Sequence, residues 1–240
     1  MPLILKKIWW VFFDLGYTLI NEDGAAFGRL QQVCDSLGEL GVNTEVADLV
    51  KSLEEASERY DPSPFGSVLN QLIPDPEHQD FVRKSGRYPK ELEKPYPDAE
   101  RLLISLAGKY QLGVIANQPD GTEARLRNYG LLSFFSVIIS STELGISKPD
   151  LEIFRVALRE AGCKSEEAVM IGDRIDNDIV PARMLGMTTI RFGTGRHAKQ
   201  QPRSWGEAPH VDVRTVDELG QMIREFAGNP PHKPDDNKTD

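Results

Sequence analysis

Cysteine and histidine, the residues that most often build disulfides and zinc sites, are scarce in this sequence. There are two cysteines, Cys34 and Cys163, and four histidines in 240 residues. The cysteines could form at most one disulfide, and their spacing matches no zinc pattern. The histidines share no spacing with cysteine or aspartate that would indicate a zinc site. We therefore expect a cytoplasmic protein, because a reducing compartment favours chains that need no disulfides.

Long hydrophobic runs are also absent. The longest uninterrupted apolar run covers residues 8–13, whereas a helix needs about 20 apolar residues to cross a bilayer. Lys6 and Lys7 precede this run, as basic residues precede the apolar region of a signal peptide, but such a region needs roughly 7–15 residues. The sequence therefore predicts neither a membrane-spanning helix nor a signal peptide.

Basic residues are outnumbered by acidic ones. Lys and Arg total 28 while Asp and Glu total 37, so the net charge is −9. This balance disfavours a broad nucleic-acid-binding surface and attachment to an anionic membrane, since both need positive charge. With 40% hydrophobic residues, the chain has the composition of a folded protein with one large domain, or a core plus an insertion. We expect no nucleic-acid or membrane partner.

Five short apolar runs stand out along the chain. They are uniformly apolar or β-branched rather than alternating, which is typical of strands buried on both faces of a parallel sheet. Helical patterns separate them, including a stripe of leucines after Asp98 and the capping-box spacing of Thr215 and Glu218. This alternation predicts an α/β fold with a doubly wound parallel sheet. The runs lie at residues 8–13, 112–116, 137–139, 168–171 and 188–192.

The segment between the first and second predicted strands is about 75 residues long, too long for one crossover helix. It carries mostly helical patterns, and prolines mark its return. We interpret residues 20–94 as an inserted α-helical cap subdomain, and residues 1–19 and 95–227 as the core. Residues 228–240 are rich in Pro, Asp, Asn and Lys without apolar periodicity, so we expect a disordered tail there.

Polar side chains follow the predicted strands where each strand ends. Ligands of open parallel sheets bind beyond the carboxyl ends of the strands, so these side chains form one candidate site. For Asp176, a helix-capping or solvated carboxylate and a metal contact both stay open. The residues are Asp14 and Thr18 after the first run, Asn117 after the second, Lys148 after the third, and Asp173, Asp176 and Asp178 after the fourth.

These residue types suit the transfer of a phosphoryl group. Asp14 and Asp173 could hold Mg²⁺, which commonly pairs one or two carboxylates with phosphate oxygens. Lys148 would neutralise the transferred group, while Thr18 and Asn117 donate hydrogen bonds to its oxygens. Asp14 would attack phosphorus to form an aspartyl-phosphate, which water then hydrolyses. The pattern thus predicts a Mg²⁺-dependent hydrolase of a small phosphorylated substrate.

Four segments resemble, in order, the motifs of the haloacid dehalogenase (HAD) superfamily. The resemblance extends to about residue 227 and implies a Rossmann-like core with a helical cap inserted after the first strand. It also implies, most often, Mg²⁺-dependent hydrolysis of phosphate esters. The segments are residues 12–19 (FFDLGYTL), 114–117 (VIAN), 147–150 (SKPD) and 171–178 (IGDRIDND).

The resemblance assigns roles to individual residues. Asp14 would be the nucleophile and first Mg²⁺ ligand, and the backbone carbonyl of Gly16 the second. Asp173 would be the third protein ligand, with Asp178 bound to the metal directly or through a water. Lys148 would bridge the nucleophile and the phosphate.

The sequence departs from the family motifs at two positions. HAD phosphatases usually carry a second aspartate where Gly16 stands, which protonates the leaving alkoxide and later activates water. Losing a positioned general acid lowers rates by about 10²–10⁴-fold. We therefore expect weak turnover of poor leaving groups, and faster turnover in a Gly16→Asp variant. Ala116 replaces the serine or threonine usually found before Asn117, which removes one hydroxyl donor.

Three functions fit these residues. The one we favour is a phosphatase, a phosphoric monoester hydrolase, acting on a small phosphorylated metabolite as a monomer or homodimer. A weakly active or non-catalytic binding or regulatory protein is the second, supported by the missing acid at Gly16. The third is a 2-haloacid dehalogenase-type hydrolase, whose leaving halide needs no proton, although the acids from Asp173 to Asp178 would repel its anionic substrate.

Overall fold

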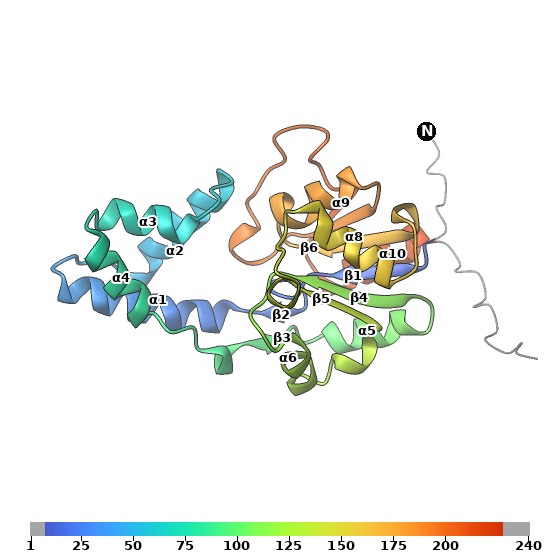
Figure 1. Ribbon diagram of the computed structural model, residues 1–240, viewed down its shortest axis with the longest axis horizontal. Helices are drawn as coiled ribbons and strands as arrows, with labels where there is room; N and C mark the ends of the chain where they lie inside the picture. The colour runs from blue at the N-terminus through green and yellow to red at the C-terminus, as the bar shows by residue number, and fades with distance from the viewer. Residues whose placement is uncertain (1–7, 228–240) are drawn as a thin grey trace, which may run out of the picture.

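The computed structural model describes residues 8–227 of the chain. This part is built on a six-stranded parallel sheet with the order β5-β4-β1-β6-β7-β8 (Figure 1). Numbered by position in the chain, its strands follow the order of the doubly wound Rossmann fold. The predicted fold class is therefore confirmed. The strands are β1 (Trp10–Phe13), β4 (Gln111–Ala116), β5 (Val137–Ser140), β6 (Ala168–Gly172), β7 (Thr188–Phe192) and β8 (Val211–Val213).

All five predicted strands are present, within one or two residues at their ends. The sequence pattern does not predict β8, because its three residues are too few to form a distinct apolar run. β8 pairs with β7 and forms that edge of the sheet.

Helices cover both faces of the sheet. The two faces have separate hydrophobic cores, each formed by strand and helix side chains. A short helix, α7 (Ser141–Leu144), follows β5. One face carries α5 (Ala99–Ala107), α6 (Thr122–Asn128) and α10 (Val216–Ala227), and the other carries α8 (Leu151–Glu160) and α9 (Val180–Met184).

Strand β1 shows why its sequence is apolar without alternation. Val11 and Phe13 enter one core, while Trp10 and Phe12 enter the other. Each such side chain contributes about 1.5–3 kcal/mol when fully buried. A polar side chain on either face of the strand would point into a hydrophobic core, so the strand contains none.

Helix α10 begins at the predicted capping box. The Glu218 amide donates to Thr215 Oγ1 at 3.2 Å, and the Thr215 amide donates to Glu218 Oε2 at 3.2 Å. Two amides of the first helical turn are thereby satisfied by side chains. The predicted start of this helix is confirmed.

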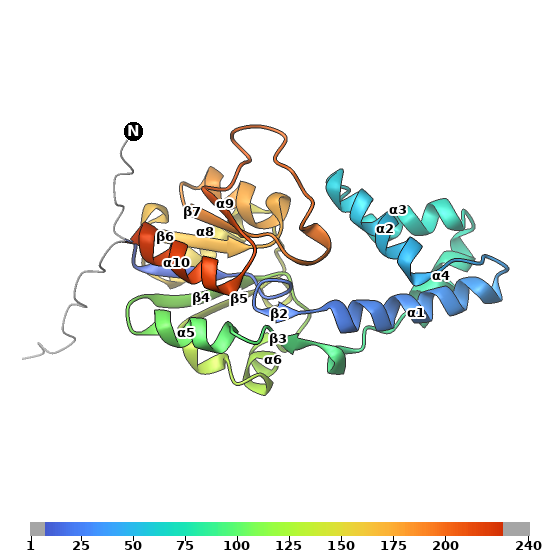
Figure 2. The same ribbon diagram turned by 180° about the vertical axis from the view of Figure 1, so that it is seen from behind.

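Between β1 and β4 the chain forms helices that pack around a hydrophobic cluster of their own. The chain leaves the core through β2 (Ile20–Asn21) and returns through β3 (Lys94–Pro95), and these two strands pair antiparallel. Figures 1 and 2 show the helices beside the sheet, joined to it at β2 and β3. They are α1 (Asp23–Glu39), α2 (Val46–Glu58), α3 (Pro64–Leu72) and α4 (Pro76–Ser85).

These helices fall within residues 20–94, the segment that the sequence assigns to a cap. The division into that cap and a core of residues 1–19 and 95–227 stays a prediction. The predicted tail, residues 228–240, lies outside the described residues. Within residues 8–227, no helix has both the length and the hydrophobicity that crossing a membrane requires.

A buried arginine holds the loop that follows β7. Arg191 is 1% exposed, and its guanidinium donates hydrogen bonds to the carbonyls of His197 (2.6 Å), Ala198 (3.0 Å) and Gln200 (2.8 Å). It also pairs with Asp212 at 3.1 Å. Because a buried guanidinium must keep its donors satisfied, these bonds fix the loop at the carboxyl end of the sheet.

Replacing Arg191 with methionine should lower the free energy of unfolding by about 2–4 kcal/mol, because the carbonyls of His197, Ala198 and Gln200 lose their donor. Urea unfolding would measure the loss. Arg155→Met, in which the exposed Arg155 loses only a surface pair with Glu152, is the control and should change stability by about 0.5 kcal/mol or less. Equal losses in the two variants would contradict this role for Arg191.

Candidate active site

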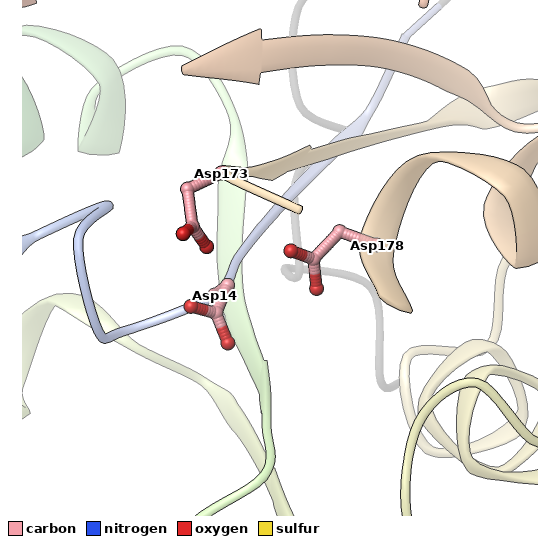
Figure 3. A group of neighbouring side chains, drawn as sticks. All are labelled: Asp14, Asp173 and Asp178. Atoms are coloured by element: carbon pink, nitrogen blue, oxygen red, sulfur yellow. The ribbon is translucent and has the colours of Figure 1, made fainter. Parts of the chain in front are cut away.

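Three buried aspartates meet at the carboxyl end of the sheet. Asp14 follows β1, Asp173 follows β6, and Asp178 lies in a π-helical turn, η4 (Ile175–Ile179). One carboxylate oxygen of each lies within 4.8 Å of those of the other two. Figure 3 shows the three carboxylates turned toward a common space. The structure therefore brings together three acids that lie far apart in the chain.

The sheet order explains why Asp14 and Asp173 are neighbours. β1 and β6 pair in parallel with Phe13 opposite Ile171, so both strands end at the same level. The chain reverses its direction of travel across the sheet between these two strands, and doubly wound sheets bind ligands at that point.

Asp178 reaches the site because of the turn that follows β6. The carboxylate of Asp178 accepts a hydrogen bond from the Arg174 amide at 3.0 Å. A Cβ atom at Gly172 would lie 2.4 Å from the Asp178 carboxylate carbon, so only glycine leaves room for this approach. The sequence pattern predicts the acid but not the π-helical turn that places it.

Lys148 lies between two of these aspartates. Its Nζ atom is 2.6 Å from Asp14 Oδ1 and 2.6 Å from Asp178 Oδ1, and it also donates to the Ile115 carbonyl at 2.9 Å. Burial opposes the lysine charge, but the charges of Asp14 and Asp178 outweigh burial and raise the pKa of Lys148. The lysine therefore stays protonated inside the protein.

The acids still exceed the nearby positive charge. Burial, followed by the charges of Asp178 and Asp14, raises the pKa of Asp173 well above its usual value. Burial also raises the pKa of Asp178 to about 6, despite the opposing charge of Lys148. The Oδ2 atom of Asp173 is buried and has no hydrogen-bond partner among the described residues. This group of oxygens fits a hard cation.

The side chains of Asn117 and Thr18, which the sequence predicts to bind phosphate, have different surroundings. The Asn117 side chain donates to the Lys148 carbonyl at 2.9 Å and accepts from the Lys148 amide at 2.8 Å, so it holds the backbone of the lysine. Asn117 also lines the active-site cavity, the cavity onto which the three aspartates open, whereas Thr18 does not. The Thr18 hydroxyl is buried without a partner among the described residues.

The aspartates open onto a cavity of about 260 Å³, which Gly16 also lines. Asp176 is absent from the carboxylate group and pairs with Arg174 at 2.6 Å. The sequence leaves a helix-capping or solvated carboxylate and a metal contact open for Asp176, and the structure shows instead a carboxylate paired with Arg174.

Similarity to known proteins identifies the family of this chain. The profile of the haloacid dehalogenase-like hydrolases matches residues 11–192. The chain belongs to this family. A glyceraldehyde 3-phosphate phosphatase of Methanopyrus kandleri is 30% identical over 227 residues, which cover 90% of this chain and 97% of that protein. The enzyme of the same name from Methanocaldococcus jannaschii is 31% identical, covering 89% and 96% of the two chains.

A solved structure of another HAD hydrolase has the same fold. The magnesium-bound structure of YfnB from Bacillus subtilis, described as revealing an interdomain movement, superposes with a TM-score of 0.71. Its sequence is 21% identical, and the match covers 91% of this chain and 99% of YfnB. The resemblance found in the motifs is therefore confirmed at the level of family and fold.

The structure adds one acidic residue that the motifs do not reveal. Glu22 lines the active-site cavity, and its Oε1 atom lies 2.7 Å from the place that a Cβ at Gly16 would occupy. Arg125 Nη2 holds this oxygen at 3.0 Å. Burial raises the pKa of Glu22, although Arg125 opposes the shift. A carboxylate thus stands beside Gly16, where this HAD sequence lacks the second aspartate.

This contact adds a cost in stability to the Gly16→Asp variant, for which the sequence predicts faster turnover. The added side chain would displace Glu22 from Arg125, so we expect it to destabilise the fold by about 1–3 kcal/mol. Glu22→Ala in the same chain should remove most of that loss. Gly38→Asp is the control, because no atom lies within 4 Å of a Cβ there. Urea unfolding of Gly16→Asp, Glu22→Ala, their double variant and Gly38→Asp measures the coupling, and additive effects at positions 16 and 22 would contradict the contact.

Proposed function

We propose that this HAD hydrolase is a Mg²⁺-dependent phosphatase that acts on a small phosphorylated metabolite through an aspartyl-phosphate. The observation that carries the proposal is Lys148 in contact with Asp14 at 2.6 Å, beside a group of three carboxylates. Transfer of a phosphoryl group needs a nucleophile and concentrated positive charge at one point. The names of the two archaeal relatives support a small phosphorylated substrate.

The oxygen donors suit Mg²⁺. Asp14, Asp173 and Asp178 would hold the ion together with the backbone carbonyl of Gly16, and a cation would satisfy the unpartnered Oδ2 of Asp173. Magnesium in the YfnB structure supports this choice. When bound, the ion supplies positive charge to the phosphoryl oxygens.

Asp14 is the nucleophile in this proposal. Lys148 holds its Oδ1 atom, so the carboxylate is oriented and Oδ2 is the oxygen that attacks phosphorus. A bond forms between Oδ2 and phosphorus while the ester bond to the leaving oxygen breaks. Asn117 keeps Lys148 in place through its two backbone hydrogen bonds.

Glu22 supplies the proton that the leaving oxygen requires. Its carboxyl group lies beside Gly16 and faces the cavity that Asp14 lines. Glu22 gives its proton to the leaving alkoxide as the ester bond breaks. The resulting carboxylate then takes a proton from the water that attacks the aspartyl-phosphate, so the acid is restored at the end of the cycle.

The alternative functions gain less support. A 2-haloacid substrate is anionic, and the buried carboxylates of Asp173 and Asp178 would repel it. The missing acid at position 16 favours a non-catalytic role, but Glu22 brings a carboxyl group beside that position.

We also propose that residues 20–94 act as a cap over the site and that the protein works in the cytoplasm. Hydrogen bonds already join α2 to the loop after β7, as in the bond from Gln200 to the Ser57 carbonyl at 3.0 Å. The movement described for YfnB supports a mobile cap. Cys34 and Cys163 are both free thiols, which suits a reducing compartment.

The test is hydrolysis of 4-nitrophenyl phosphate and of a panel of phosphorylated metabolites, measured as phosphate release with Mg²⁺ and with EDTA. Removing Mg²⁺ should abolish turnover, and Asp14→Asn should lower it by at least about 10³-fold, because the nucleophile is lost. Asp35→Asn, at an exposed position of α1, should leave the rate unchanged. Halide release from 2-haloacids without phosphatase activity would refute the proposal.

Glu22→Gln tests the proton transfer separately. It should lower the rate with alkyl phosphates by about 10²–10⁴-fold, while acetyl phosphate, whose leaving group needs little protonation, should lose far less. Glu93→Gln is the matched control, because Glu93 also pairs with Arg125 but does not line the active-site cavity. Equal slowing of both substrate types by Glu22→Gln would refute this role for Glu22.

A further inference from the structure

Arg196, at the edge of the active-site cavity, lacks the acidic partner that its neighbours have. Its guanidinium lies 5.6 Å from the centre of the Tyr17 ring, and no carboxylate among residues 8–227 comes within ion-pairing distance of it. Burial opposes the charge of Arg196, but Tyr17 and the more distant charge of Glu22 outweigh burial and raise the pKa of Arg196, so the guanidinium stays charged without a carboxylate in contact. Three other arginines near the site are paired: Arg125 with Glu22 and Glu93, Arg174 with Asp176, and Arg191 with Asp212.

The loop that carries Arg196 is fixed against the nucleophile loop. Gly195 has a φ of +59°, and a Cβ there would lie 2.1 Å from Tyr17 Cδ1, so the backbone rests directly on the tyrosine ring. The Thr194 hydroxyl donates to the Tyr17 carbonyl. On the other side, Arg191 holds the His197 carbonyl at 2.6 Å. The backbone that carries Arg196 is therefore held at one place beside the loop that follows Asp14.

That place is the junction of two cavities. Tyr17 and Arg196 line both the active-site cavity and a second cavity of about 410 Å³ between the core and helices α1 and α2. The second cavity is mainly apolar, and one of its two aromatic residues, Phe27, is 58% exposed. It also contains two acids, of which Glu54 pairs with Lys199 at 2.6 Å. Its apolar residues are Ala26, Phe27, Leu30, Val50 and Leu53, and its acids are Asp23 and Glu54.

A second arginine adds positive charge from the side of α1. Arg29 also has no carboxylate of residues 8–227 within ion-pairing distance, and its buried Nε atom has no hydrogen-bond partner among the same residues. Burial, and next the charge of Arg196, lowers the pKa of Arg29. The two guanidinium groups therefore interact across the boundary between α1 and the core.

We propose that Arg196 binds a carboxylate of the substrate, so that the substrate is the phosphate ester of a small hydroxy acid or hydroxy amino acid. This inference rests on the proposed function. With the phosphoryl group at Asp14 and Lys148, the carbon chain extends toward the second cavity and passes Arg196. A guanidinium forms two parallel hydrogen bonds with a carboxylate, which favours this anion over a neutral hydroxyl or aldehyde group.

The test compares phosphoserine with phosphoethanolamine, two esters that differ by the carboxylate alone. The wild type should favour phosphoserine in kcat/KM. Arg196→Gln should lower kcat/KM for phosphoserine by about 10–100-fold, the loss of one charged pair, and should change that for phosphoethanolamine by less than about threefold. Arg196→Lys should recover part of the loss. Arg203→Gln, which removes an exposed arginine from the segment between β7 and β8, is the control.

Binding of the same two esters to the Asp14→Asn protein, measured by calorimetry with Mg²⁺, gives a readout that needs no turnover. Tighter binding of phosphoserine that disappears in Arg196→Gln would support the proposal. Equal slowing of both esters by Arg196→Gln would overturn it, since Arg196 would then contact the transferred phosphoryl group. Equal binding of both esters to the Asp14→Asn protein that keeps Arg196 would also overturn it. Failure of the proposed function differs from these results, because 4-nitrophenyl phosphate would not be hydrolysed either.

Discussion

The contact of the Lys148 ammonium with Asp14 and Asp178, at 2.6 Å from each, is the interaction on which the site depends. Three buried carboxylates within a few ångströms would repel one another strongly without a cation. The lysine compensates part of that charge and leaves Asp173 with an unpartnered oxygen. The remaining negative charge makes the site receptive to a divalent metal ion, whereas a fully neutralised cluster would have little reason to bind one.

The pairing of the strands keeps these carboxylates close together. β1 and β6 pair in parallel, so Asp14 and Asp173 leave the sheet at the same level. Gly172 has no side chain, which lets the π-helical turn fold Asp178 over the end of β6. The hydrophobic cores on both faces of the sheet hold these strand ends in place. A slip in the register of β1 against β6 would therefore separate Asp14 from Asp173.

Two residues outside the family motifs modify this site. Glu22 brings a carboxyl group into the space that Gly16 leaves open, and it comes from the chain segment between β2 and α1. Arg196 approaches from the loop after β7 and has no carboxylate of the described residues within ion-pairing distance. A missing motif residue thus does not by itself show a missing chemical group, because another part of the chain can occupy the same space.

The sequence by itself determined the fold class, five of the strands and the polar residues at their ends, since strands buried on both faces must be uniformly apolar and their ligand-binding ends must be polar. It did not determine β8, the π-helical turn at Asp178, or the places of Glu22 and Arg196. Those features have no periodic pattern, because they arise from short segments held by distant neighbours. Only the tertiary structure decided which side chains share one cavity, since that depends on packing between segments far apart in the chain.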